Sequence, residues 1–193
     1  MLRGLLRITI LAGCFSFASL AATAQEVVNA LIGTVRYIDT AAKTITITTE
    51  DGSDAQFKDL INANTSIEFD PNIRTDVTAA AEFKKSGVRA IVYYIGSGDV
   101  RTVVALRSLG PGPFIISSGT VVRFDKKGHS FSIKDQSGAM QSFMITSDTA
   151  AETGFGAVSG LKFQPQKGDE VRVNAVAANG SSTALFINTV IVN

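Results

Sequence analysis

The segment GTVRYID at residues 33–39 returns later in the chain as GTVVRFD at residues 119–125, an offset of 86 residues. The same offset places TITI at 44–47 over SFSI at 130–133. It also places Gly52 over Gly138 and Phe57 over Phe143. A fixed spacing kept over this length indicates an internal repeat. The chain therefore contains two copies of one structural unit.

Each copy has the pattern of a β-structure. Residues 44–49 alternate Ile with Thr, which predicts a strand with one buried face, and Asp51-Gly52 predicts the turn that follows. Similar patterns predict strands at 30–38, 44–49, 56–61, 88–95 and 100–109, and again at 120–124, 130–134, 140–146, 170–177 and 184–192. Three strands, an excursion and a closing hairpin follow the order of the OB barrel. We expect an all-β protein of two tandem small five-stranded OB-like barrels.

The excursion differs between the copies. Within residues 76–85, Thr78-Ala79-Ala80-Ala81-Glu82 predicts a short capped helix between the third and fourth strands of the first barrel. Residues 154–160 in the second copy are rich in glycine and predict a loop. The run Gly110-Pro111-Gly112-Pro113 can continue neither helix nor strand. The predicted domains are therefore residues 25–110 and 111–193.

Residues 1–24 have the layout of a secretory signal peptide. Arg3 and Arg7 precede an apolar stretch at 8–21, and Ala22-Thr23-Ala24 predicts a cleavage site. The apolar stretch is too short to span a bilayer, and no other segment of the sequence reaches 18 apolar residues. We expect an exported protein, periplasmic or secreted, with no transmembrane span in the mature chain.

Cys14 supports an alternative localisation. Leu11-Ala12-Gly13-Cys14 resembles a lipobox, which would make the protein a lipoprotein anchored through Cys14, although apolar sequence continues beyond that cysteine. Cys14 is the only cysteine, so cleavage after Ala24 leaves none for a disulfide. The mature chain would carry 16 Lys and Arg, from 18 minus the two leader arginines, against 17 Asp and Glu. This nearly neutral balance argues against nucleic-acid partners.

The sequence offers little catalytic chemistry. His129 is the only histidine and follows Gly128 in a predicted turn, and a nucleophile needs a base within reach. No glycine motif for phosphate binding is present. Asp51 and Asp54 flank a turn glycine, where aspartate is favoured for local backbone hydrogen bonds. We expect no enzyme activity and no cofactor.

The repeated motifs resemble those of a known group of proteins. The segments at 33–39 and 44–47, the Asp51-Gly52 turn and KGDEVRV at 167–173 resemble exported bacterial OB-fold-like domains of unknown function. Such domains often occur in tandem behind a signal peptide. The resemblance covers both copies and implies fold and compartment, without an activity.

A second and fainter resemblance is to the periplasmic copper-chaperone OB barrels. That family binds metal through a strand histidine, two closely spaced methionines and a tryptophan, for which the candidates here are His129, Met140 and Met144. His129 precedes its predicted strand, the methionines are four residues apart, and the chain has no tryptophan.

The resulting expectation is a non-enzymatic binding or assembly module of the cell envelope. Its partner would be an unknown envelope protein or a small ligand, and no metal site is assigned to it. One alternative is a periplasmic copper carrier using His129, Met140 and Met144. Another is a carbohydrate-binding accessory module.

Overall fold

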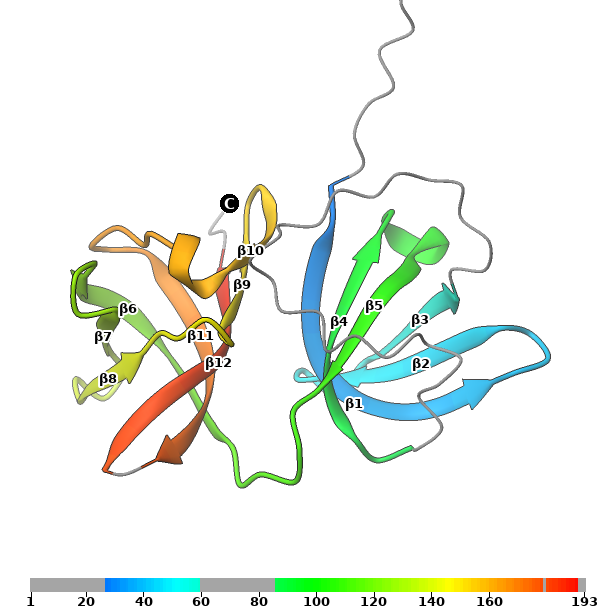
Figure 1. Cartoon of the computed structure of the whole chain (residues 1–193), viewed down its shortest axis with the longest axis horizontal. Coiled ribbons are helices and arrows are strands. Elements are labelled where there is room, and N and C mark those ends of the chain that lie inside the picture. The colour runs from blue at the N-terminus through cyan, green and yellow to red at the C-terminus, as the bar shows by residue number, and fades with distance from the viewer. Residues whose placement is uncertain (1–26, 60–85, 179, 191–193) are drawn as a thin grey trace, which may run out of the picture.

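The computed structural model describes residues 27–59, 86–178 and 180–190 (Figure 1). The predicted signal peptide at 1–24, with Cys14, and the predicted helix within 76–85 lie outside these residues. Among the described residues, no helix is both long and apolar enough to cross a membrane. The described secondary structure is β-strand with short 3₁₀ turns, which confirms the all-β fold class.

The first five strands close into a barrel. They are β1 (Asn29–Asp39), β2 (Thr44–Thr49), β3 (Asp54–Asp59), β4 (Arg89–Ile95) and β5 (Thr102–Ser108), with a 3₁₀ turn η2 (Gly98–Val100) before β5. Neighbouring strands follow the order β1-β2-β3-β5-β4, and β4 pairs back with β1. The parallel pair β3–β5 completes the ring. This is the predicted OB-like strand order.

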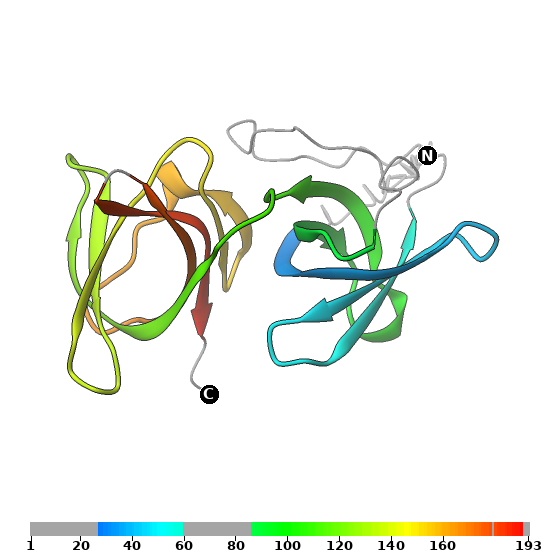
Figure 2. The same ribbon diagram turned by 90° about the horizontal axis from the view of Figure 1, so that it is seen from below.

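The remaining strands form a seven-stranded sheet. They are β6 (Ile115–Asp125), β7 (Ser130–Lys134), β8 (Met140–Met144), β9 (Ala150–Thr153), β10 (Gly156–Ser159), β11 (Glu170–Ala178) and β12 (Ser181–Val190), with η3 (Gly160–Lys162) after β10. The sheet order is β10-β9-β12-β11-β6-β7-β8, and β12 also pairs with β8. That pairing closes β6, β7, β8, β12 and β11 into a second ring, which lies beside the first in Figure 2.

The hairpin of β9 and β10 corrects one prediction. The glycine-rich segment 154–160 was expected to be a loop, and the second copy was expected to have five strands. Instead, Gly156–Ser159 pairs antiparallel with Ala150–Thr153, which in turn pairs parallel with β12. The hairpin occupies the excursion between the third and fourth barrel strands. Pairing with β9, which is itself paired with β12, satisfies backbone groups of the glycine-rich segment that a loop would leave unpaired.

The offset of 86 residues is also visible in the backbone. Register shifts fall between Val35 and Tyr37 in β1 and between Val121 and Arg123 in β6, which are equivalent positions. A Cβ at Gly33 would lie 2.6 Å from the carbonyl oxygen of Thr48, and one at Gly119 would lie 2.4 Å from that of Lys134. Both glycines therefore permit the same close approach between two strands.

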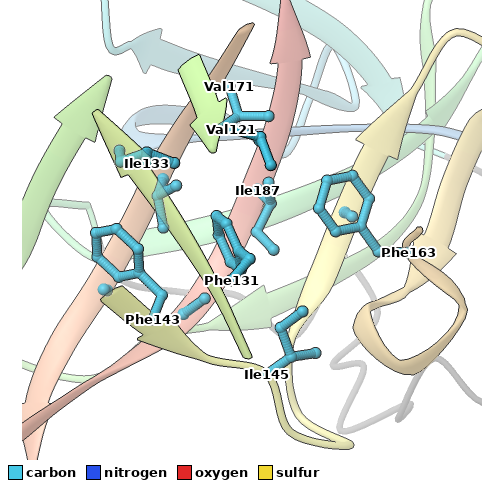
Figure 3. Close-up of a cluster of buried hydrophobic side chains, with 12 residues drawn as sticks. Val121, Phe131, Ile133, Phe143, Ile145, Phe163, Val171 and Ile187 are labelled. Carbon is cyan, nitrogen blue, oxygen red and sulfur yellow. The ribbon is translucent and has the colours of Figure 1, made fainter. Parts of the chain in front are cut away.

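Each barrel has its own apolar core. The second core is shown in Figure 3, where side chains from β6, β7, β8, β11 and β12 converge with Phe163. Fully burying one such side chain contributes roughly 1.5–3 kcal/mol. The equivalent core positions are Val35 and Val121, Ile45 and Phe131, Ile47 and Ile133, and Phe57 and Phe143, all at most 2% exposed.

A third apolar cluster joins the two barrels. The first barrel contributes the outer face of β4, the start of β1 and Ala105, and the second contributes Ala150 and Phe186. Among the residues that the structure describes, its buried members are Val28, Ala30, Ile32, Ile91, Tyr93, Ile95, Ala105, Ala150 and Phe186. The barrels are therefore packed against each other through a shared core.

Beside this cluster, Glu50 bridges the barrels. Its carboxylate forms ion pairs with Arg89 of β4 and, at 2.8 Å, with Arg172 of β11. Asn174 donates to Glu50 Oε2 at 3.2 Å and accepts from Arg89 Nη2 at 2.6 Å. Only 11% of the Glu50 side chain is exposed, so water screens these charges poorly.

Candidate binding face

The outer face of β7 and β8, called here the methionine face, consists of Ser130, Ser132, Lys134, Met140, Ser142 and Met144. Alternation along both strands turns Phe131, Ile133 and Phe143 into the barrel, so the six intervening residues point outward. The antiparallel register sets Ser130 opposite Met144, Ser132 opposite Ser142 and Lys134 opposite Met140. The two central serine hydroxyls lie 2.8 Å apart.

Two apolar side chains are exposed on this face. Met140 is 58% exposed and Met144 is 39% exposed, and both come from a strand whose opposite face is core. Exposed apolar side chains can form part of an interaction site. Methionine in particular adapts to irregular apolar partners. In the sequence, these two residues stand out only as candidate metal ligands.

The first barrel presents a polar surface at the equivalent strands. Its register sets Thr44 opposite Lys58, Thr46 opposite Gln56 and Thr48 opposite Asp54. Asp54 accepts a hydrogen bond from Thr48 Oγ1 at 2.9 Å and is paired with Arg36. At the offset of 86, Asp54 corresponds to Met140 and Lys58 to Met144. The two barrels thus share a fold and differ in the chemistry of this face.

His129 lies at the end of the methionine face. It has a left-handed backbone with φ of 47°, and the equivalent Lys43 has φ of 55°. Its carbonyl oxygen accepts from the Ile145 backbone at 2.7 Å, which places His129 next to the end of β8 that carries Met144. These contacts are those of a residue in a hairpin turn.

The three candidate metal ligands are not gathered at one point. Met140 and Met144 stand at opposite ends of β8, and four residues of extended chain span about 13 Å. The structure brings His129 toward Met144 and leaves Met140 apart. Within the described ranges, no group of three or more His, Cys, Asp or Glu residues could hold a metal ion.

The turn aspartates are engaged in local hydrogen bonds. Asp125 Oδ1 accepts from the backbone of Lys127 and Gly128, at 3.1 and 2.9 Å. Asp51 accepts from Thr49 Oγ1 and from Ser53, and these bonds, Thr49 first, lower its pKa to about 2. Asp54 is held by Thr48 and Arg36. Asp51 and Asp125 make the local turn hydrogen bonds that the sequence indicated, whereas Asp54 bonds to side chains of β1 and β2.

A cleft of about 150 Å³ lies beside β6, β7, β11 and β12 of the second barrel. Its lining residues are Ser118, Gly119, Thr120, Lys134, Asp135, Gln136, Glu170, Val171 and Val190. At the equivalent place in the first barrel, Glu50 and Arg89 make the contacts to Arg172 and Asn174. No pattern in the sequence pointed to this cleft, because its lining comes from four separate segments.

Comparisons with known proteins give little beyond this geometry. No family model matches the chain, and no curated protein matches it. Among solved structures, the crystal structure of Ag(I)CusF is similar with a TM-score of 0.32 and 19% sequence identity, covering 41% of this chain and 100% of that chain. The likeness agrees with the fainter resemblance noted in the sequence, to the copper-chaperone OB barrels, and at this TM-score it supports no statement about function.

Proposed function

We propose that this chain is an exported, non-enzymatic binding module of the cell envelope that binds a protein partner through the methionine face. The single observation that carries the proposal is the exposure of Met140 and Met144 on the outside of a strand. Methionine is enriched at protein interfaces. The central serines add hydroxyl groups that can donate or accept hydrogen bonds at such an interface.

The contact between the barrels supports the same proposal. The shared apolar cluster and the Glu50 ion pairs hold the second barrel against the first. A surface held by a packed scaffold loses little conformational entropy when a partner binds. The first barrel would then act as a support for the face carried by the second.

The test transfers the chemistry of the first barrel to the second. The double variant Met140→Asp and Met144→Lys reproduces Asp54 and Lys58 at the equivalent positions. Gln56→Lys, on the exposed outer face of β3, is the matched control. Tagged wild-type and variant proteins are expressed in the native host, cross-linked in the envelope and analysed by mass spectrometry.

We expect a partner to be recovered with wild type and Gln56→Lys and lost with the double variant, while all three proteins have equal melting temperatures. Equal recovery of that partner with the double variant would overturn the proposal. So would the absence of any partner enriched over a tag-only control.

A periplasmic copper carrier remains the second candidate, because His129 lies toward Met144. A carrier using both residues requires Cu(I) binding that is lost in His129→Ala and in Met144→Ala. A carbohydrate-binding module instead requires a melting-temperature shift with envelope oligosaccharides. A ligand at 100 times its dissociation constant adds about 2.7 kcal/mol.

Export is tested separately. Mature protein from the envelope fraction should begin at Gln25, and Cys14→Ser should leave its processing unchanged. A lipid-modified N-terminal Cys14 in wild type, absent from Cys14→Ser, would establish the lipoprotein alternative.

A further inference from the structure

The β9–β10 hairpin of the second barrel docks along the start of β1 in the first barrel. Residues Asn29–Ile32 of β1 pair with β4, whereas pairing with β2 begins only at Gly33. Among the described strands, none pairs with the other edge of this segment. Ala157 of β10 donates its N–H to the Val28 carbonyl at 2.7 Å, and Ala30 donates its N–H to Glu152 Oε2 at 2.6 Å. Figure 1 shows the hairpin between the two rings.

Glu152 is a half-buried carboxyl group in this contact. Burial raises its pKa to about 7, opposed only by the hydrogen bond from Ala30. Among the described residues, the titratable group that faces it is Tyr94 of β4, whose pKa is raised by burial and then by Glu152, and lowered by Arg101. Its sheet neighbours are Ala157 of β10 and Asn188 of β12, which do not titrate.

We propose that the β9–β10 hairpin is a pH-sensitive latch between the two barrels, which holds β1 most firmly when Glu152 carries a proton. The protonated carboxyl group accepts the Ala30 N–H through its carbonyl oxygen without placing a charge in a partly dehydrated site. Desolvation of the ionised Glu152 carboxylate in this site costs more free energy than its hydrogen bond with the Ala30 N–H contributes. The opposing state has the hairpin lifted and Glu152 hydrated.

The direction of the pH effect follows from linkage. A hydrated carboxyl group, as in the open latch, would have the ordinary pKa of 4.5, and burial in the closed latch raises the pKa to about 7. The free energy of closing is therefore most favourable below pH 4.5. It becomes less favourable as the pH rises from 4.5 to about 7, and it is constant above that pH. Opening would expose Val28, Ala30 and Phe186 of the shared apolar cluster. The latch would thereby make the accessibility of the face between the barrels depend on pH.

Amide hydrogen exchange at Ala30 tests the latch, because the bond from its N–H goes to Glu152. The mature wild-type chain is measured at pH 5 and pH 8, with correction for intrinsic exchange, beside Glu152→Gln. The exposed Glu170→Gln is the matched control, and Val173, central in the second barrel, is the reference amide. From pH 5 to pH 8, we expect the protection of the Ala30 amide to fall by about 10-fold to 300-fold in wild type and in Glu170→Gln. The protection of this amide should not change with pH in Glu152→Gln.

Constant protection of Ala30 in wild type, or an equal fall in Glu152→Gln, overturns the proposal. If Glu152→Gln does not fold, carbon-detected titration of the Glu152 carboxyl in wild type decides. A midpoint near 7 supports the latch, and one near 4.5 rejects it.

Discussion

Gly119 lies where β6 passes closest to the end of β7. A Cβ at this position would lie 2.4 Å from the carbonyl oxygen of Lys134 and 2.9 Å from its carbonyl carbon, which are backbone atoms that cannot turn aside. The glycine is therefore needed for strand contact within the second barrel. Gly33 occupies the same place in the first barrel.

Gly119→Ala should lower the free energy of unfolding by about 1–3 kcal/mol, because the strands must separate to admit the methyl group. Ser118→Ala, at the adjacent exposed position, should change it by less than about 0.5 kcal/mol. Urea unfolding followed by circular dichroism measures both. Equal stability of Gly119→Ala and wild type would contradict the close approach.

His129 has a left-handed backbone conformation, which favours glycine at this position. A left-handed residue other than glycine costs roughly 1–2 kcal/mol, partly offset by the greater entropy that glycine has in the unfolded chain. His129→Gly should therefore raise the unfolding free energy by up to about 1 kcal/mol, as should Lys43→Gly at φ of 55°. Thermal unfolding without metal provides the measurement. A loss of stability would show that the His129 side chain makes contacts that the turn does not require.

Many single residues were predictable because their role is local. The aspartates at the turns and the alternating core residues of β2 and β7 follow from turn chemistry and period-two burial. Matching GVR at 87–89 to GDEVR at 168–172 predicts that Arg172 is the counterpart of Arg89, and this prediction is wrong. Arg89 pairs with Thr34 and Glu170 with Thr120, so Glu170 is the counterpart of Arg89. Small gaps before β11 shifted the match, and Arg172 instead points toward Glu50.

At the scale of elements, the β9–β10 hairpin could not be predicted from local sequence. Its strands have four residues each, and Gly154 and Gly156 favour turns. The hairpin forms because β12 pairs with one side of it and β1 lies along the other. Tertiary contacts of this kind override weak strand propensity.

Gly156→Ala should undo the docking of this hairpin. Gly156 has φ of +103°, and a Cβ there would lie 2.6 Å from the carbonyl oxygen of Val28 in the first barrel. Gly168→Ala is a matched control, since Gly168 has φ of +104° with nothing within 4 Å of the added Cβ. We expect exchange at Ala30 to accelerate in Gly156→Ala and to stay near wild type in Gly168→Ala. Equal exchange in the two variants would mean that backbone strain, and not the contact with β1, explains the effect.

At the scale of the whole molecule, one feature of the sequence is related to the contact between the barrels. Residues 89–95 read RAIVYYI, and their apolar run does not alternate with polar residues. Such a run is typical of a strand buried on both faces. One face of β4 enters the first core and the other, through Ile91 and Tyr93, enters the shared cluster. Arg172 and Asn174 occupy the equivalent outward positions in β11, so the residues that make this contact differ between the two repeats.

Glu50→Gln should destabilise the whole chain by about 3 kcal/mol, because Arg89 and Arg172 would lose their shared carboxylate in a poorly hydrated site. Asp54→Asn removes a carboxylate from the exposed pair with Arg36 and should cost less than about 1 kcal/mol. Chemical denaturation compares the two. Similar small losses would indicate that the Glu50 pairs contribute no more than a surface ion pair.

The most direct measurement is urea unfolding of residues 25–193 followed by the backbone resonances of Val92 in β4 and Val173 in β11, each central in its own barrel. Two barrels joined by a shared apolar core should unfold together, so the native signals of both residues should disappear at one urea concentration. Separate midpoints would contradict the single two-barrel unit, and with it the support that the first barrel gives to the methionine face.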